Sequence, residues 1–286
     1  MSDPLIEISF YFLLFAFFST WFGACVGSFL NVCIYRIPRD ESVITPRSHC
    51  PHCNALIPWY LNIPVASWLC LRGKCASCKG PIAFRYTLVE LLTAMLFLAV
   101  FMKWAAPAAM HMLPIPHPLI IAIYWLFLAG LVLGTFVDFE HLIIPDSVTI
   151  GGMVAGPILS ALVPALHAKE IWWQGLVTSL IGLAAGFGLL NAVAWLGTKA
   201  FKKEAMGFGD VKLMGAIGAF LGWQAVLFTV FVSSLLGSVV GLLLIAFGGI
   251  KLQSRIPFGP YISAAALIWV FWGPALIGAY MKLLQP

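Results

Sequence analysis

Two groups of residues in this sequence have types and spacing that could support chemistry: aspartates at the edges of apolar segments, and two pairs of cysteines. Asp210 follows a glycine-rich stretch at 207–209 and precedes a long apolar run, while Asp138 ends another apolar run. Paired carboxylates can activate water, and paired Cys-x-x-Cys units are typical of zinc sites. The two cysteine pairs, separated by 21 residues, are Cys50/Cys53 and Cys75/Cys78.

The composition predicts that most of this chain lies in a membrane. Of its 286 residues, 62% are hydrophobic and 9% are charged, a balance far from that of soluble domains. Apolar runs of about 20 residues match the hydrocarbon core of a bilayer. The predicted fold class is therefore an all-α polytopic membrane protein with about eight transmembrane helices. The eight segments are 9–35, 87–104, 119–137, 147–166, 171–197, 211–222, 225–248 and 259–282.

The distribution of Lys and Arg predicts how these segments are oriented. With eight spans, the loops at 36–86, 198–212 and 249–258 share one side of the membrane. They hold thirteen of the sixteen basic residues, so the positive-inside rule predicts that these loops are cytoplasmic and both termini outside. The same bias explains most of the net charge of +5, and no nucleic-acid partner is predicted.

The loop at 36–86 carries both cysteine pairs and is predicted to be a small cytoplasmic zinc-ribbon-like insert. Four thiolates complete a tetrahedral zinc site and leave no position open for water, so the zinc would be structural. A domain of about 50 residues has too little core to be stable alone, and the metal would supply folding energy directly. The predicted ligands are Cys50, Cys53, Cys75 and Cys78.

Two alternatives remain open for these cysteines from the sequence. They could form two disulfides, although a reducing cytoplasm disfavours them. His49 or His52 could also replace a thiolate as a ligand. Cys70 lies inside the loop but outside both pairs, and no role is assigned to it.

Acidic residues at membrane depth are costly and are therefore candidates for function. Four of the five in this chain also have an ordinary structural explanation. Asp146 and Asp210 each precede an apolar segment and could cap a helix. Glu140 lies in a short loop, and Glu90 could pair with Arg85 or with a neighbouring helix. Asp138 has no such explanation, because it ends a helix, where the helix dipole disfavours an acid.

The predicted topology brings Asp138 and Asp210 to the same face of the membrane on different helices. Two carboxylates that share one proton can activate water against a peptide bond, since one accepts a proton from the water while the other polarises the carbonyl. Other hydrolytic motifs, such as His-Glu-x-x-His and Gly-x-Ser-x-Gly, do not occur in the sequence. The residues therefore favour a hydrolytic pair of aspartates.

The segment GFGD at 207–210 resembles the Gly-x-Gly-Asp motif of intramembrane aspartic proteases. Further segments resemble the pattern of bacterial type IV prepilin peptidases, in the order of that family. They are GACVGSFLNVCIYRIPR in the first span, the paired cysteines, RYTLVELLTA, VDFEHLIIPD and IPFGPYISAA. The resemblance covers nearly the whole chain, with gaps at 105–125 and 160–200.

This resemblance implies that Asp138 and Asp210 are catalytic, with Asp146 in a supporting position. It implies cleavage of the leader peptide of type IV prepilins or pseudopilins at the cytoplasmic face of the inner membrane. The new N-terminal residue, usually Phe, would then be N-methylated with S-adenosylmethionine as the methyl donor. The methyl-transfer site is expected near the cytoplasmic end of the first span and the zinc loop, with Glu90 as its acidic candidate.

Two functions of other classes remain open from the residues. A proton-coupled transporter would also carry buried aspartates, although it normally shows internal repeats and broken helices. A zinc-ribbon membrane adaptor without activity would explain the cysteines but not Asp138. On the peptidase interpretation, the chain divides into a first transmembrane helix at 1–35, a zinc-binding loop domain at 36–86 and a transmembrane peptidase core at 87–286.

Overall fold

The computed structural model describes residues 4–109, 117, 119–203, 206–248 and 256–283, so much of the predicted loop at 249–258 lies outside the described residues. Each predicted apolar segment corresponds to one helix, and no strand occurs in the described ranges, which confirms the all-α fold class. The predicted number of about eight spans is not confirmed, because two of the eight helices are short. The helices are α1 (Pro4–Arg36), α3 (Phe84–Ala109), α4 (Leu119–His141), α5 (Asp146–Leu162), α6 (Trp172–Phe201), α7 (Phe208–Leu221), α8 (Trp223–Ala246) and α9 (Gly259–Leu283), with a short α2 (Ala66–Cys70) in the polar loop.

Helix length separates these elements into two kinds. Within the described residues, six helices are long and apolar enough to cross a membrane: α1, α3, α4, α6, α8 and α9. The other two, α5 and α7, have 17 and 14 residues. A 14-residue helix extends over only about 21 Å, which is less than the hydrocarbon core of a bilayer. Because α7 is buried along nearly its whole length, it is an interior helix rather than a lipid-facing one.

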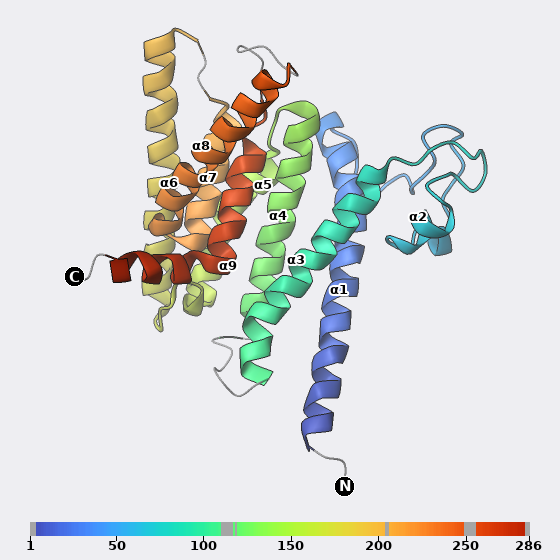
Figure 1. The fold of residues 1–286 in the computed structure, drawn as a ribbon, viewed down its shortest axis with the longest axis horizontal. Helices are drawn as coiled ribbons and strands as arrows, with labels where there is room; N and C mark the ends of the chain where they lie inside the picture. The colour runs from blue at the N-terminus through green and yellow to red at the C-terminus, as the bar shows by residue number, and fades with distance from the viewer. Residues whose placement is uncertain (1–3, 110–116, 118, 204–205, 249–255, 284–286) are drawn as a thin grey trace. The chain divides into compact units, whose positions relative to one another are not determined.

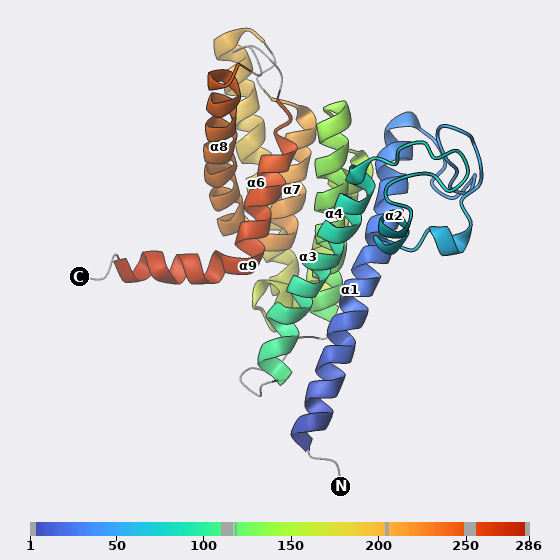
Figure 2. The same ribbon diagram turned by 45° about the vertical axis from the view of Figure 1, so that its right-hand side comes forward.

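The chain forms two compact units, residues 1–133 and 134–286. In the first unit, α1 and α3 run side by side, as both views show (Figures 1 and 2). Gly23 and Gly27 make this packing possible, because a Cβ built on Gly27 would lie 2.7 Å from the Cα of Glu90 on α3. The Gly-xxx-Gly spacing therefore brings two helix backbones into direct contact, as it does in other membrane proteins.

In the second unit, α5 and α6 hold α7 through small residues. A Cβ built on Gly182 of α6 would lie 2.1 Å from the carbonyl oxygen of Gly218, and one built on Gly156 of α5 would lie 2.6 Å from the Cβ of Ala219. The buried Ser179 hydroxyl donates a hydrogen bond of 2.7 Å to the Ala219 carbonyl. These contacts fix the position of α7, and with it the acidic residue in its first turn.

Candidate active site and metal centre

Asp138 lies in the last turn of α4, with only 5% of its surface exposed. The helix ends where Leu142 adopts a left-handed conformation (φ 55°) and donates its N–H to the Asp138 backbone carbonyl at 3.0 Å. The Asp138 side chain accepts a second hydrogen bond through Oδ2, from the backbone N–H of Gly259 at 2.9 Å. Gly259 is the first residue of α9. The N-terminus of α9 therefore stabilises the charge of Asp138, which the C-terminus of α4 disfavours.

Asp210 lies in the first turn of α7 and is 9% exposed. The prediction that it caps the helix is wrong, because the N-cap residue is Gly207, whose carbonyl accepts the Asp210 N–H at 3.1 Å. The capping prediction for Asp146 is also wrong, since α5 begins at Asp146 itself and Pro145 is its N-cap residue. Both aspartates therefore lie inside a first helical turn, where a negative charge is favoured.

The structure brings Asp138 and Asp210 together inside the second unit, close enough for the charge of one to act on the other. Buried Ile144, from the connection between α4 and α5, lies between the elements that carry them. A Cβ built on Gly209, next to Asp210, would lie 3.3 Å from the Ile144 Cβ. A Cβ built on Gly259 would lie 3.1 Å from the Ile144 Cδ1 and 2.7 Å from Asp138 Oδ2. The segments that carry the two carboxylates are thus packed around Ile144.

Asp146 has different surroundings from these two aspartates. Its side chain is 62% exposed and forms an ion pair with Lys212 of α7, and the Thr149 hydroxyl donates a weak hydrogen bond of 3.4 Å to it. The ion pair joins the beginning of α5 to the first turns of α7. Asp146 therefore helps to hold the helix that carries Asp210.

The four predicted cysteine ligands converge in the loop between α1 and α3. Their sulfur atoms all lie within 4.8 Å of one another. The two pairs have the same backbone geometry, since the Cys50 N–H donates to the Ala55 carbonyl at 2.9 Å and the Cys75 N–H to the Gly80 carbonyl at 2.8 Å. Backbone N–H groups of Cys78 and Ser77 lower the pKa of the Cys75 thiol to about 6, which favours a thiolate.

This donor set fits a tetrahedral metal such as zinc, which would hold the two halves of the loop together. The seven cysteines are unpaired, and sulfurs of the two pairs face each other, with Cys50 Sγ 3.9 Å from Cys78 Sγ. That arrangement does not support the disulfide alternative. Among the described residues, the cluster contains neither His49 nor His52. Cys70 lies at the end of α2 and is exposed.

The Glu90 side chain on α3 binds a backbone N–H group of the same loop. Its Oε2 accepts the Val65 N–H at 2.7 Å, and the Ser28 hydroxyl of α1 also donates to this carboxylate. Val65 has φ 62° and ψ −51°, a conformation that a β-branched residue rarely adopts. The hydrogen bond to Glu90 therefore helps to keep this segment of the loop in an unusual shape.

A cavity of about 460 Å³ lies between the end of α1 and the loop. Its lining combines polar and aromatic side chains, including Ser28, Arg36, Arg47, Trp59 and Asn62. The buried Arg36 donates to the carbonyls of Ser42 and Pro46 at 2.9 and 2.7 Å and so shapes one wall of the cavity. A concave site with a few converging polar groups is typical of small-molecule binding.

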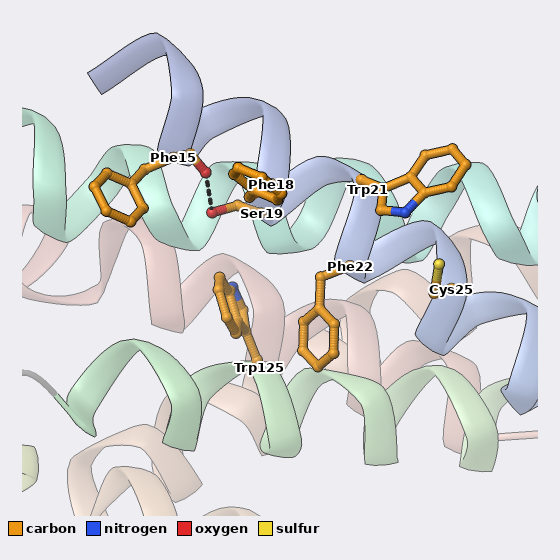
Figure 3. A pocket seen from close by; sticks show the side chains of 7 residues that line it. All are labelled: Phe15, Phe18, Ser19, Trp21, Phe22, Cys25 and Trp125. Atoms are coloured by element: carbon orange, nitrogen blue, oxygen red, sulfur yellow. Dashed lines mark hydrogen bonds between the residues drawn. The ribbon is translucent and has the colours of Figure 1, made fainter. Parts of the chain in front are cut away.

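A second cavity, of about 400 Å³, has a different character (Figure 3). Phe22 of α1 and Trp125 of α4 line it, and both lie between the two helix ribbons in Figure 3. Its one side-chain hydroxyl, on Ser19, donates to the Phe15 carbonyl of the same helix at 2.7 Å. The rest of the lining is aromatic apart from the Cys25 thiol, and it holds no charged side chain to orient a methyl donor, so this cavity is the weaker candidate.

Comparison with known families matches two parts of the chain. Residues 21–104 match the Bacterial Peptidase A24 N-terminal domain, and residues 125–242 match the Type IV leader peptidase family. The first match covers the cysteine loop, and the second covers Asp138 and Asp210. No solved structure matches.

Several curated relatives are named prepilin leader peptidase/N-methyltransferase. The relative from Aeromonas hydrophila is 36% identical over 288 residues, covering 91% of this chain and 91% of its own. The relative from Legionella pneumophila is 32% identical over 288 residues, covering 91% and 92%. The relative from Myxococcus xanthus is 40% identical over 232 residues, which is 81% of this chain but 64% of the relative.

Proposed function

Because this chain belongs to the type IV leader peptidase family, we propose that it cleaves the leader from type IV prepilins or pseudopilins and then methylates the new N-terminal residue. The observation that carries the proposal is the buried pair formed by Asp138 and Asp210 within the matched peptidase region. The names of the relatives, which pair a leader peptidase with an N-methyltransferase, support both activities.

Cleavage would use Asp138 and Asp210 as a general acid and base that share one proton. The charged carboxylate takes a proton from water, and the water oxygen attacks the peptide carbonyl, which the protonated carboxyl polarises. The C–N bond then breaks as a proton passes to the leaving nitrogen. The products are the leader with a new carboxylate and the mature chain with a free amine.

The active site would face the cytoplasm, and the chain would lie in the inner membrane of a bacterium. The support for this orientation is the concentration of thirteen of the sixteen Lys and Arg residues in the loops at 36–86, 198–212 and 249–258. The six long apolar helices support a multi-pass arrangement.

Methyl transfer would take place at the cavity between α1 and the loop, which a zinc ion on Cys50, Cys53, Cys75 and Cys78 would stabilise. S-adenosylmethionine supplies the methyl group. Arg47 suits the carboxylate of this donor, and Trp59 offers a face for an aromatic base. Glu90 does not line the cavity, but it holds Val65 next to Pro64, which does. Glu90 would therefore act through the loop rather than by contact with the donor.

Trp59→Ala is expected to raise the Kd for S-adenosylmethionine about 3- to 10-fold, the size of one aromatic contact. Equilibrium dialysis with the labelled donor measures this Kd. Tyr60→Ala is the matched control, because Tyr60 is a neighbouring exposed aromatic that does not line the cavity. Equal losses in the two variants would argue against this cavity as the donor site.

Asp146→Asn is expected to lower leader cleavage by less than about fivefold, because an exposed ion pair contributes about 0–1 kcal/mol. The Asp146 side chain pairs with Lys212 at the protein surface rather than with the buried aspartates. The rate of leader release, measured beside Asp138→Asn, checks this expectation. A loss as large as that of Asp138→Asn would place Asp146 among the reacting groups.

The proposed function is tested by incubating the purified protein with a prepilin and labelled S-adenosylmethionine in detergent. Mass spectrometry is expected to show loss of the leader and one methyl group on the new N-terminal amine. An unchanged prepilin would contradict the proposal. Proton-coupled uptake by reconstituted vesicles, without leader loss, would favour a transporter instead.

A further inference from the structure

The segment IPFGPYISAA, in which α9 begins at Gly259, contributes one hydrogen bond to Asp138 but has no role yet in the proposed cleavage. The first N–H groups of a helix have no partner inside the helix. In α9, Pro260 has no N–H, and those of Tyr261 and Ile262 donate to the Phe258 carbonyl at 3.1 and 3.2 Å. The Gly259 N–H is thus left over, and it donates to Asp138 Oδ2 at 2.9 Å in a buried hydrogen bond.

Gly259 also leaves no room for a side chain beside Asp138. A Cβ there would lie 2.7 Å from Asp138 Oδ2, closer than real Cβ atoms approach other atoms. Gly259 does not have a positive φ, unlike Gly73, Gly222 and Gly248. A side chain at this position would therefore have to displace the Asp138 carboxylate or Ile144, even though the backbone conformation does not call for glycine.

We propose that Gly259 is a positioning residue for peptide cleavage. Its N–H fixes the Asp138 carboxylate, and its lack of a side chain leaves room for that carboxylate. The inference rests on the proposed catalytic role of Asp138. The hydrogen bond occupies Oδ2 and leaves Oδ1 for the water or the peptide carbonyl. It also prevents the carboxylate from turning away from Asp210, which lies in the first turn of the firmly packed α7.

Gly259→Ala is expected to lower the kcat of leader cleavage about 10- to 100-fold, the effect of losing a hydrogen bond to a charged group. The KM should change less than about twofold, because the bond acts on the reacting group rather than on substrate binding. Methyl transfer to a synthetic peptide that already begins with Phe should stay at the wild-type rate. Gly278→Ala is the matched control, since Gly278 is on the same helix with open space around it.

A second variant removes the hydrogen-bond donor at position 259 without adding a side chain. It also covers the case in which Gly259→Ala does not fold. Glycolic acid is placed at position 259 by an acylated suppressor tRNA in cell-free synthesis, which replaces the N–H with an ester oxygen. We expect this variant to cleave about tenfold more slowly than wild type. Wild-type cleavage by either the Ala variant or the ester variant would overturn the inference. Wild-type cleavage by Asp138→Asn would instead overturn the proposed catalytic pair, whatever Gly259 does.

Discussion

Replacing Asp138 or Asp210 with Asn is expected to lower leader cleavage about 1,000-fold, because an amide cannot accept the proton from water or return it to the leaving amine. Asn has nearly the shape of Asp, and its oxygen can still accept the Gly259 N–H at position 138. The fold should therefore survive the substitution. Leader release from a purified prepilin, followed on a gel, measures the effect.

Methyl transfer supplies the internal control for these two variants. The candidate methyl-transfer cavity lies in the unit formed by residues 1–133, and both aspartates lie in the unit formed by residues 134–286. Each Asn variant should therefore methylate a synthetic peptide that begins with Phe at the wild-type rate. Loss of that activity in well-folded protein would show that the two sites are not independent.

Replacing Cys50 or Cys75 with Ser is expected to release the metal and unfold the loop at 36–86. Zinc binding by four thiolates contributes about 10–16 kcal/mol in small zinc domains, and a loop of this size has little core to replace it. We expect about one zinc per chain in wild type and none in either variant. Elemental analysis and limited proteolysis of the loop measure the two effects, and methyl transfer should fall with them.

Cys70→Ser is the matched control, because Cys70 is in the same loop but outside the cluster of four. It should keep its zinc, its resistance to protease and its methyl-transfer activity. Wild-type protein purified without chelator and free of zinc would contradict the metal site. A variant with all four ligands replaced by Ser and full methyl transfer would show that the metal is dispensable for that reaction.

The sequence could predict the helices, the cysteine cluster and the proximity of the aspartates, because each depends on a pattern along the chain. Hydrophobic length marks the eight helices, and Cys-x-x-Cys spacing marks the two halves of the metal site. The distribution of Lys and Arg predicts that the end of α4 and the beginning of α7 share one face of the membrane. These patterns are local, so they can be read without a structure.

The parts that the sequence could not predict depend on contacts between distant segments. The bond from Gly259 to Asp138 joins residues that are 121 positions apart. Ile144 is an ordinary apolar residue in the sequence, and its place beside Gly209 and Gly259 emerges only from packing. The capping predictions for Asp146 and Asp210 were wrong because the cap positions belong to Pro145 and Gly207. Helix ends are set by such details and vary by a residue or two.

The central claim, that Asp138 and Asp210 act as one catalytic unit, is tested most directly by a double-mutant comparison of leader cleavage. Groups that act as a unit are strongly non-additive, so removing one costs about as much as removing both. We predict that the variant with both Asp138→Asn and Asp210→Asn cleaves a prepilin as slowly as either single variant, about 1,000-fold below wild type. Substantial cleavage by either single variant, or a double variant slower by the product of the two single effects, would contradict the account.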